Sequence, residues 1–120
     1  MFKILIVDDK KAILKALYNE LNIENFQVVT LSAIGLMWEY IRQVRPDLVL
    51  LGLHSDSFDS WQILNDIKKK IPDLPVLIYI IDCHRSMNSI KRAIYEVLKN
   101  GSISSAFMFH ALKTPESEKI

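Results

Sequence analysis

The stretch Ile4-Leu5-Ile6-Val7-Asp8-Asp9 decides the fold, because four consecutive apolar residues are followed at once by two carboxylates. A short run of Ile, Leu and Val without polar alternation is typical of a parallel strand that is covered on both faces. Further runs of this kind lie at residues 28–31, 48–51, 76–81 and, more weakly, 106–109. The sequence therefore predicts five parallel strands, with an acidic pair directly after the first.

Longer stretches between these runs carry apolar residues at spacings of three and four, which is the pattern of amphipathic helices. Four helices are predicted, marked by Ile13, Ala16, Leu17 and Leu21; by Ala33, Leu36, Met37, Tyr40, Ile41 and Val44; by Trp61, Leu64, Ile67 and Ile71; and by Ile90, Ala93, Ile94, Val97 and Leu98. A fifth helix begins at Thr114-Pro115-Glu116 but is short or truncated, since the sequence ends at Ile120. This alternation predicts an open, doubly wound α/β sheet with right-handed crossovers and helices on both faces.

Composition sets broad limits on what the chain does. The 120 residues carry a net charge of +1 and half of them are apolar, which predicts a single domain over residues 1–120, either alone or as the N-terminal part of a longer protein. The single Cys83 excludes an internal disulfide, and neither a signal peptide nor an apolar run of membrane-spanning length is found, so we expect a cytoplasmic protein. The low net charge gives no general attraction to nucleic acid or to a membrane.

Asp8 and Asp9 are the first candidate site residues. Ligands of open α/β sheets bind beyond the carboxyl ends of the strands, and two adjacent carboxylates at that edge tolerate each other when a cation lies between them. Mg²⁺ prefers such oxygen ligands, so the pair predicts a magnesium site. A simpler interpretation stays open, in which Asp9 only caps the first helix.

Other polar and aromatic residues receive structural interpretations. His54, His84 and His110, together with Cys83, match no spacing of metal ligands and are interpreted as structural or neutral groups. Trp38 and Trp61 lie within helical patterns and are interpreted as partly buried packing residues. The basic run Lys68-Lys69-Lys70 ends a predicted helix, where cations complement the helix dipole.

Three motifs in register resemble the receiver domains of two-component response regulators. They are Ile4-Leu5-Ile6-Val7-Asp8-Asp9, then Arg45-Pro46-Asp47-Leu48-Val49-Leu50-Leu51, and finally Leu74-Pro75-Val76. The resemblance implies the flavodoxin-like (CheY-like) sheet with strand order 2-1-3-4-5. It also implies that an aspartate at the end of the third strand takes a phosphoryl group from a histidine kinase and shares Mg²⁺ with the acid pair.

The positions that would carry this phosphotransfer depart from the family pattern. Gly52 stands where the acceptor aspartate belongs, and glycine has no nucleophile. Ile80 falls on the hydroxyl position at the end of the fourth strand, and Met108 on the lysine position of the fifth, or Lys113 if that loop is longer. Losing a carboxylate ligand also weakens the expected Mg²⁺ site.

We therefore predict a non-enzymatic, receiver-like signalling domain that is not phosphorylated and acts through protein–protein interaction. Its expected partners are a histidine kinase, an output domain or a second copy of itself, and no cofactor is required. The resemblance places the contact face near Lys91, Arg92, Tyr95, Glu96 and Lys99. The alternative is a receiver that uses Asp56 or Asp59 as the acceptor with Mg²⁺, although Asp59 is also well placed to cap the third helix.

Overall fold

The computed structural model describes residues 1–53, 58–80, 86–99 and 107–111. In chain order the elements are β1 (Lys3–Val7), α1 (Lys11–Ile23), β2 (Gln27–Leu31), the short 3₁₀ helix η1 (Ile34–Leu36), α2 (Met37–Val44), β3 (Leu48–Gly52), α3 (Ser60–Lys70), β4 (Val76–Ile80), α4 (Ser86–Lys99) and β5 (Phe107–Ala111). The expected fifth helix at 114–116 lies outside the described residues, so the extent of the domain over residues 1–120 stays a prediction.

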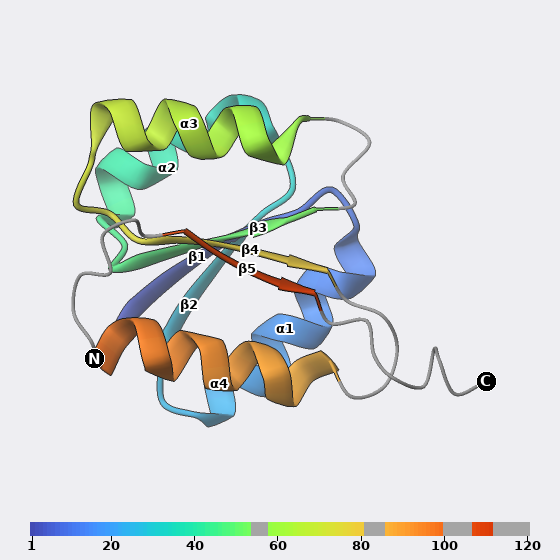
Figure 1. Ribbon diagram of the computed structural model, residues 1–120. Helices are drawn as coiled ribbons and strands as arrows, with labels where there is room; N and C mark the ends of the chain where they lie inside the picture. Colours follow the sequence, from blue (N-terminus) through green and yellow to red (C-terminus); the bar gives the residue numbers. More distant parts are fainter. Residues whose placement is uncertain (54–57, 81–85, 100–106, 112–120) are drawn as a thin grey trace.

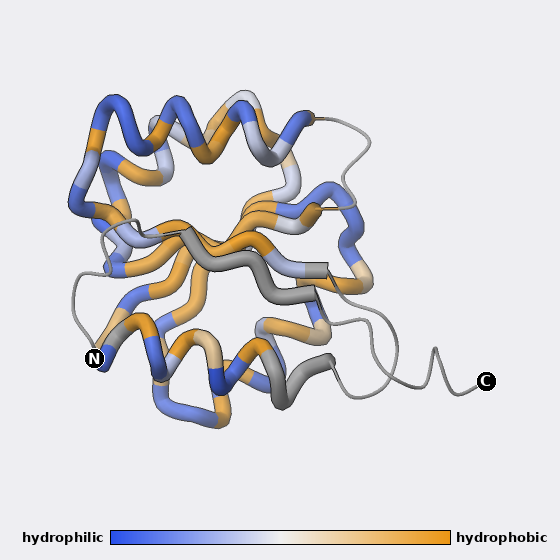
Figure 2. Tube along the Cα trace, in the orientation of Figure 1, coloured by the Kyte–Doolittle hydropathy of each residue, from blue (hydrophilic) through white to orange (hydrophobic). Residues whose placement is uncertain are grey.

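The five strands form one parallel sheet in the order β2-β1-β3-β4-β5 (Figure 1). This is the flavodoxin-like arrangement that the sequence predicts, and the strand order is confirmed. Strands β1, β3 and β4 consist mainly of apolar residues (Figure 2), and every residue of β3 is buried. Apolar runs without alternation arise because a parallel sheet is covered by helices on both faces.

Two helical layers enclose the sheet (Figure 1). Side chains that alternate along the strands divide the core into two clusters. One cluster joins Ile4, Ile6, Leu48, Leu50, Leu77 and Tyr79 to α1 and α4, and the other joins Leu5, Val7, Val49, Leu51, Val76 and Ile78 to α2 and α3. Helices on both faces are therefore confirmed.

The position of α4 contradicts the prediction that every crossover between parallel strands is right-handed. Strands β3, β4 and β5 follow one another in the same direction across the sheet, yet α3 covers one face and α4 the other (Figure 1). The β4–α4–β5 unit therefore has the opposite hand from β3–α3–β4, which is rare in parallel sheets. Ile90, Ala93, Ile94 and Val97 of α4 are buried in the same cluster as the apolar residues of α1.

Polar contacts hold α4 beside α1. The Lys91 ammonium lies 3.1 Å from a carboxylate oxygen of Glu20 and 3.0 Å from one of Glu24. The Tyr95 hydroxyl donates a hydrogen bond of 3.0 Å to the Glu24 carboxylate. The centroid of the Tyr95 ring lies 5.5 Å from the centroid of the Phe26 ring. The hydrogen bond from Lys91 lowers the pKa of Glu24, and the reciprocal bond raises the pKa of Lys91. These contacts connect the middle of α4 to the C-terminal end of α1.

Candidate functional site

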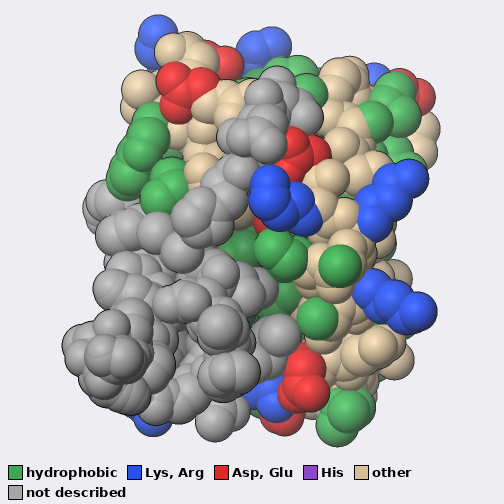
Figure 3. Space-filling model, turned by 90° about the vertical axis from the view of Figure 1, so that its right-hand side faces the viewer, with side chains coloured by type: hydrophobic (Ala, Val, Ile, Leu, Met, Phe, Trp, Pro, Cys, Tyr) green, Lys and Arg blue, Asp and Glu red, His purple; other side chains and the backbone are tan. Residues whose placement is uncertain are grey.

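The carboxyl ends of β1, β3 and β4 bring Asp8, Gly52 and Tyr79 together at one edge of the sheet. Gly52 pairs with Tyr79 in the register of β3 and β4, and Asp8 follows β1, which lies on the other side of β3. Figure 3 looks onto this edge, where acidic and basic side chains lie next to one another near the middle of the face. The sequence predicted the location of the site, but it gave no role to Tyr79.

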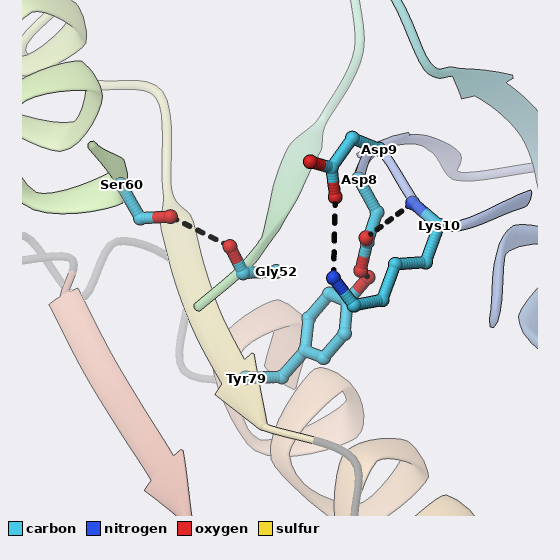
Figure 4. A network of polar contacts seen from close by, with 6 residues as sticks. All are labelled: Asp8, Asp9, Lys10, Gly52, Ser60 and Tyr79. Carbon is cyan, nitrogen blue, oxygen red and sulfur yellow. Dashed lines mark hydrogen bonds and ion pairs between the residues drawn. The ribbon is translucent and has the colours of Figure 1, made fainter. Parts of the chain in front are cut away.

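Asp8 is the centre of the arrangement (Figure 4). Its side chain is buried, and one carboxylate oxygen accepts a hydrogen bond of 2.6 Å from the Tyr79 hydroxyl. The other oxygen accepts a bond of 2.9 Å from the backbone N–H of Lys10. Hydrogen bonds to a charged acceptor are stronger than neutral ones, and a buried carboxylate needs such partners. Asp8 is thus held in one orientation by two donors from within the chain.

Tyr79 is the site residue that the sequence analysis missed. It lies inside the apolar run of β4 and is almost wholly buried, so its ring resembles any other core residue. Burial, followed by the charge of Asp8 and the hydrogen bond to it, raises the pKa of the Tyr79 hydroxyl well above its usual value of 10.0. The hydroxyl therefore stays protonated and donates. The sequence did hold one indication of this role, which is a tyrosine within a strand predicted to be buried. A buried hydroxyl requires a hydrogen-bond partner, so such a tyrosine indicates a polar group beside it.

Steric contact with Asp8, and not the backbone conformation, accounts for a glycine at position 52. A Cβ atom at this position would lie 2.7 Å from Cγ of Asp8 and still closer to one of its carboxylate oxygens, with the Tyr79 hydroxyl oxygen at 3.2 Å. The backbone at Gly52 is not left-handed, so it does not require glycine. The Asp8 carboxylate occupies the volume that a side chain of residue 52 would need. A longer side chain, such as aspartate, would have to displace it.

Backbone contacts fix Gly52 in this position. The Ser60 hydroxyl, buried at the start of α3, donates a hydrogen bond of 2.6 Å to the carbonyl oxygen of Gly52 (Figure 4). The N–H of Leu53 donates a bond of 2.8 Å to the carbonyl of Tyr79. These bonds join the end of β3 to α3 and β4.

The second acid of the predicted metal pair, Asp9, lies beside a cation of the chain itself. Its carboxylate is 3.7 Å from the ammonium of Lys10. The interpretation that Asp9 caps the first helix is wrong, since the N-cap residue of α1 is Lys10 and the carboxylate that accepts its N–H is that of Asp8. Within the described ranges, no group of three or more His, Cys, Asp or Glu side chains could hold a metal ion. Asp8 thus already accepts hydrogen bonds from Tyr79 and Lys10, and Asp9 lies beside the Lys10 ammonium.

The remaining predicted positions lie as follows. Ile80 ends β4, as expected. Met108 pairs with Leu77, which lies two residues before Tyr79 on β4. β5 ends at Ala111, two residues beyond the Phe109 that the sequence predicts as its end. The β5 residue level with Tyr79 is His110, so Met108 lies away from the carboxyl edge. Lys113, Asp56, His54, Cys83 and His84 lie outside the described residues.

Asp59 caps α3, as the sequence predicts. One of its carboxylate oxygens accepts hydrogen bonds from the backbone N–H groups of Trp61, at 3.0 Å, and Gln62, at 3.3 Å. These bonds satisfy two donors that a helix N-terminus would otherwise leave without partners.

The predicted partner face divides into two parts. Lys91 and Tyr95 contact Glu20, Glu24 and Phe26 within the chain, as described above. Arg92, Glu96 and Lys99 lie exposed on α4.

No helix in the part of the chain that the structure describes is long and apolar enough to cross a membrane.

Comparison with known proteins agrees with the fold. A family model described as the response regulator receiver domain matches residues 4–107. The transcriptional regulatory protein GlrR of Escherichia coli (strain K12) is 33% identical over 75 residues, which make up 62% of this chain and 17% of GlrR. The chain thus corresponds to a small part of that relative.

Solved structures include similar domains. The N-terminal signal receiver domain of a two-component system response regulator from Bacteroides fragilis is 29% identical, with a TM-score of 0.63, and the match covers 91% of this chain and 82% of that one. A two-component response regulator from Clostridium difficile has a TM-score of 0.72 at 14% identity over 82% of this chain and 97% of that one, which shows the shared fold. Receiver domains are signalling modules that interact with kinases and output domains. On these grounds the chain belongs to the response regulator receiver domain family of two-component systems.

Proposed function

We propose that this receiver domain signals without phosphorylation, by binding other signalling proteins. The observation that carries the proposal is the position of the Asp8 carboxylate, which fills the space beside Gly52 and is held there by Tyr79. The site thus lacks the nucleophile, and the volume for that nucleophile is taken by a hydrogen-bonded pair. We expect a stable, closed edge of the sheet instead of a reactive one.

The chemistry of the alternative acceptors supports this proposal. Transfer to a carboxylate requires a free oxygen aligned with the donor phosphorus, and misplacement by about 1 Å costs on the order of 100-fold in rate. Asp8 is buried and both of its oxygens accept hydrogen bonds. Asp59 caps α3 and would have to give up this cap in order to react. Asp56, the other candidate, lies outside the described residues.

Mg²⁺ is not required for the function that we propose. The Lys10 ammonium lies near Asp9 and supplies a positive charge to the acidic edge. A bound Mg²⁺ would have to compete with this cation and with the donors on Asp8. We therefore expect weak binding of the metal at Asp8 and Asp9.

The expected partners are a histidine kinase, an output domain or a second copy of the chain, in the cytoplasm. Arg92, Glu96 and Lys99 on the exposed side of α4 are the part of the predicted face that remains open to such a partner. Lys91 and Tyr95 would then act indirectly, by holding α4 against α1.

Incubation with acetyl phosphate and Mg²⁺, followed by measurement of the intact mass, tests the proposal. We expect the mass to stay unchanged, whereas a receiver with an aspartate at the end of β3 gains one phosphoryl group under the same conditions. A hydroxylamine-sensitive phosphoryl adduct would contradict the proposal. Its loss in Asp56→Asn or in Asp59→Asn would then identify the substitute acceptor.

A further inference from the structure

A basic groove lies between the C-terminal ends of α2 and α3, at the edge of the sheet opposite to Asp8 and Gly52. It has a volume of about 410 Å³ and is lined by Trp38, Ile41, Arg42, Arg45, Lys70 and Ile71. An adjoining hollow of about 250 Å³ shares Ile41, Arg45 and Ile71 and adds Pro46 and Leu74. Because helices run against the strands in such sheets, this groove is remote from the site described above.

The groove combines apolar walls with a cationic rim. Ile41 and Leu74 are buried and form part of its floor, whereas Arg42, Arg45 and Lys70 are exposed at its margin. Among the described residues, no ion pair joins these three cations to an acidic side chain. Positive charge is thus left available to an external anion.

Trp38 gives the groove an aromatic wall. It is half-buried against the core on the α2 side, and the Lys70 ammonium lies 5.2 Å from the centre of its ring. A cation over an aromatic face is favourable and orients the lysine towards the groove. The interpretation of Trp38 as simple packing therefore describes only part of its surroundings.

Arg45 differs from Arg42 and Lys70 in its backbone conformation. Cations in the last turn of a helix are common, and this explains Arg42 on α2 and Lys70 on α3. Arg45 instead follows α2 in the left-handed conformation, with φ of 55°, where glycine or asparagine is usual. A strained residue that persists at a groove suggests a use for its side chain.

We propose that this groove binds an acidic peptide segment of a partner protein. Carboxylates of the peptide would pair with Arg42, Arg45 and Lys70, and a neighbouring apolar side chain would enter the hollow beside Trp38. Guanidinium groups bind carboxylates through paired hydrogen bonds, and an apolar anchor in a pocket supplies binding energy. Single-stranded nucleic acid fits less well, because Lys70 covers the Trp38 ring on which a base would stack.

The two tryptophans of the chain make the test specific. Trp61 lies at the start of α3, far from the groove, and 44% of its surface is exposed. The full chain, labelled with ¹⁵N, is titrated with short peptides in which Glu and Asp flank a Leu or a Phe. We expect the indole N–H resonance of Trp38 to move and that of Trp61 to stay in place.

Charge variants show whether the rim provides the affinity. Arg42→Glu together with Arg45→Glu is expected to weaken peptide binding by about 10-fold or more, since charge pairs across an interface become repulsive. Lys15→Glu, at an exposed position of α1 on the other face of the sheet, is the control and should bind normally. Arg45→Gly removes the guanidinium and relieves the left-handed strain, so it should weaken binding while keeping or raising the thermal stability.

Four results would overturn the proposal. The first is no shift of the Trp38 resonance with any acidic peptide at millimolar concentration, and the second is an equal response to peptides with Gln and Asn in place of the acids. The third is an equal loss of binding in Lys15→Glu, and the fourth is tighter binding of a single-stranded oligonucleotide or of inorganic phosphate. A normal fold of each variant, checked by the dispersion of its ¹⁵N spectrum, excludes unfolding as the cause of lost binding.

Discussion

Replacing Gly52 with alanine should destabilise the domain far more than the same change at Gly35. A Cβ atom at residue 52 would meet the carboxylate of Asp8, with Cγ only 2.7 Å away, whereas a Cβ at residue 35 would have nothing within 4 Å. Asp8 would have to move and would lose its short bond from Tyr79. The two positions therefore form a matched pair within one chain.

The magnitude follows from the contacts that are lost. A buried hydrogen bond to a charged group contributes about 1.5–3 kcal/mol, and overpacking costs about 1–3 kcal/mol. The two terms overlap, because movement of Asp8 relieves the clash while breaking the bond. We expect Gly52→Ala to lower the free energy of unfolding by about 2–4 kcal/mol. Gly35→Ala should leave it unchanged or raise it by up to about 1 kcal/mol.

Urea denaturation followed by circular dichroism measures both free energies of unfolding. A double-mutant cycle with Tyr79→Phe then locates the cause, since both substitutions remove the same bond. The cost of the double variant should fall short of the sum of the single costs by at least about 1 kcal/mol. Equal stability of the Gly52→Ala and Gly35→Ala proteins, or strictly additive costs in the cycle, would refute this account of the site.

Three further predictions concern pH, metal and the α3 cap. The raised pKa of Tyr79 means that its contribution to stability is complete below about pH 10, the unfolded value, and is lost as the pH rises towards the folded value. The free energy of unfolding should therefore decrease less steeply with rising alkaline pH in Tyr79→Phe than in the unsubstituted protein. Identical pH dependences of the two proteins would contradict the raised pKa of Tyr79. Titration with Mg²⁺ should leave the amide resonances of Asp8 and Asp9 almost unmoved, and sub-millimolar saturation would show that the carboxylates form a good site. Asp59→Ala should lose about 1 kcal/mol of stability in urea, because two N–H groups of α3 lose their acceptor, whereas Asp59→Asn should retain most of it.

Local patterns in the sequence predicted the elements and much of the site. Apolar runs without alternation identified the five strands to within one or two residues, because burial on both faces leaves a direct mark on composition. The turn after β1 placed Asp8 at the carboxyl edge, and Asp59 was correctly expected to cap α3. The absence of a nucleophile at Gly52 is also a property of the sequence alone.

Contacts between distant segments were decided only by the tertiary structure. The bond between Tyr79 and Asp8 joins residues 71 positions apart, and it depends on the register of β3 against β4, which no local pattern encodes. The face on which α4 packs is likewise visible only in the structure, where its apolar residues join the cluster that contains α1. Composition and periodicity thus determined what each segment is, because they report its burial. The folded arrangement determined which side chains meet. At Gly52 the sequence shows only a missing side chain, whereas the aligned strands place the Asp8 carboxylate in the space beside it.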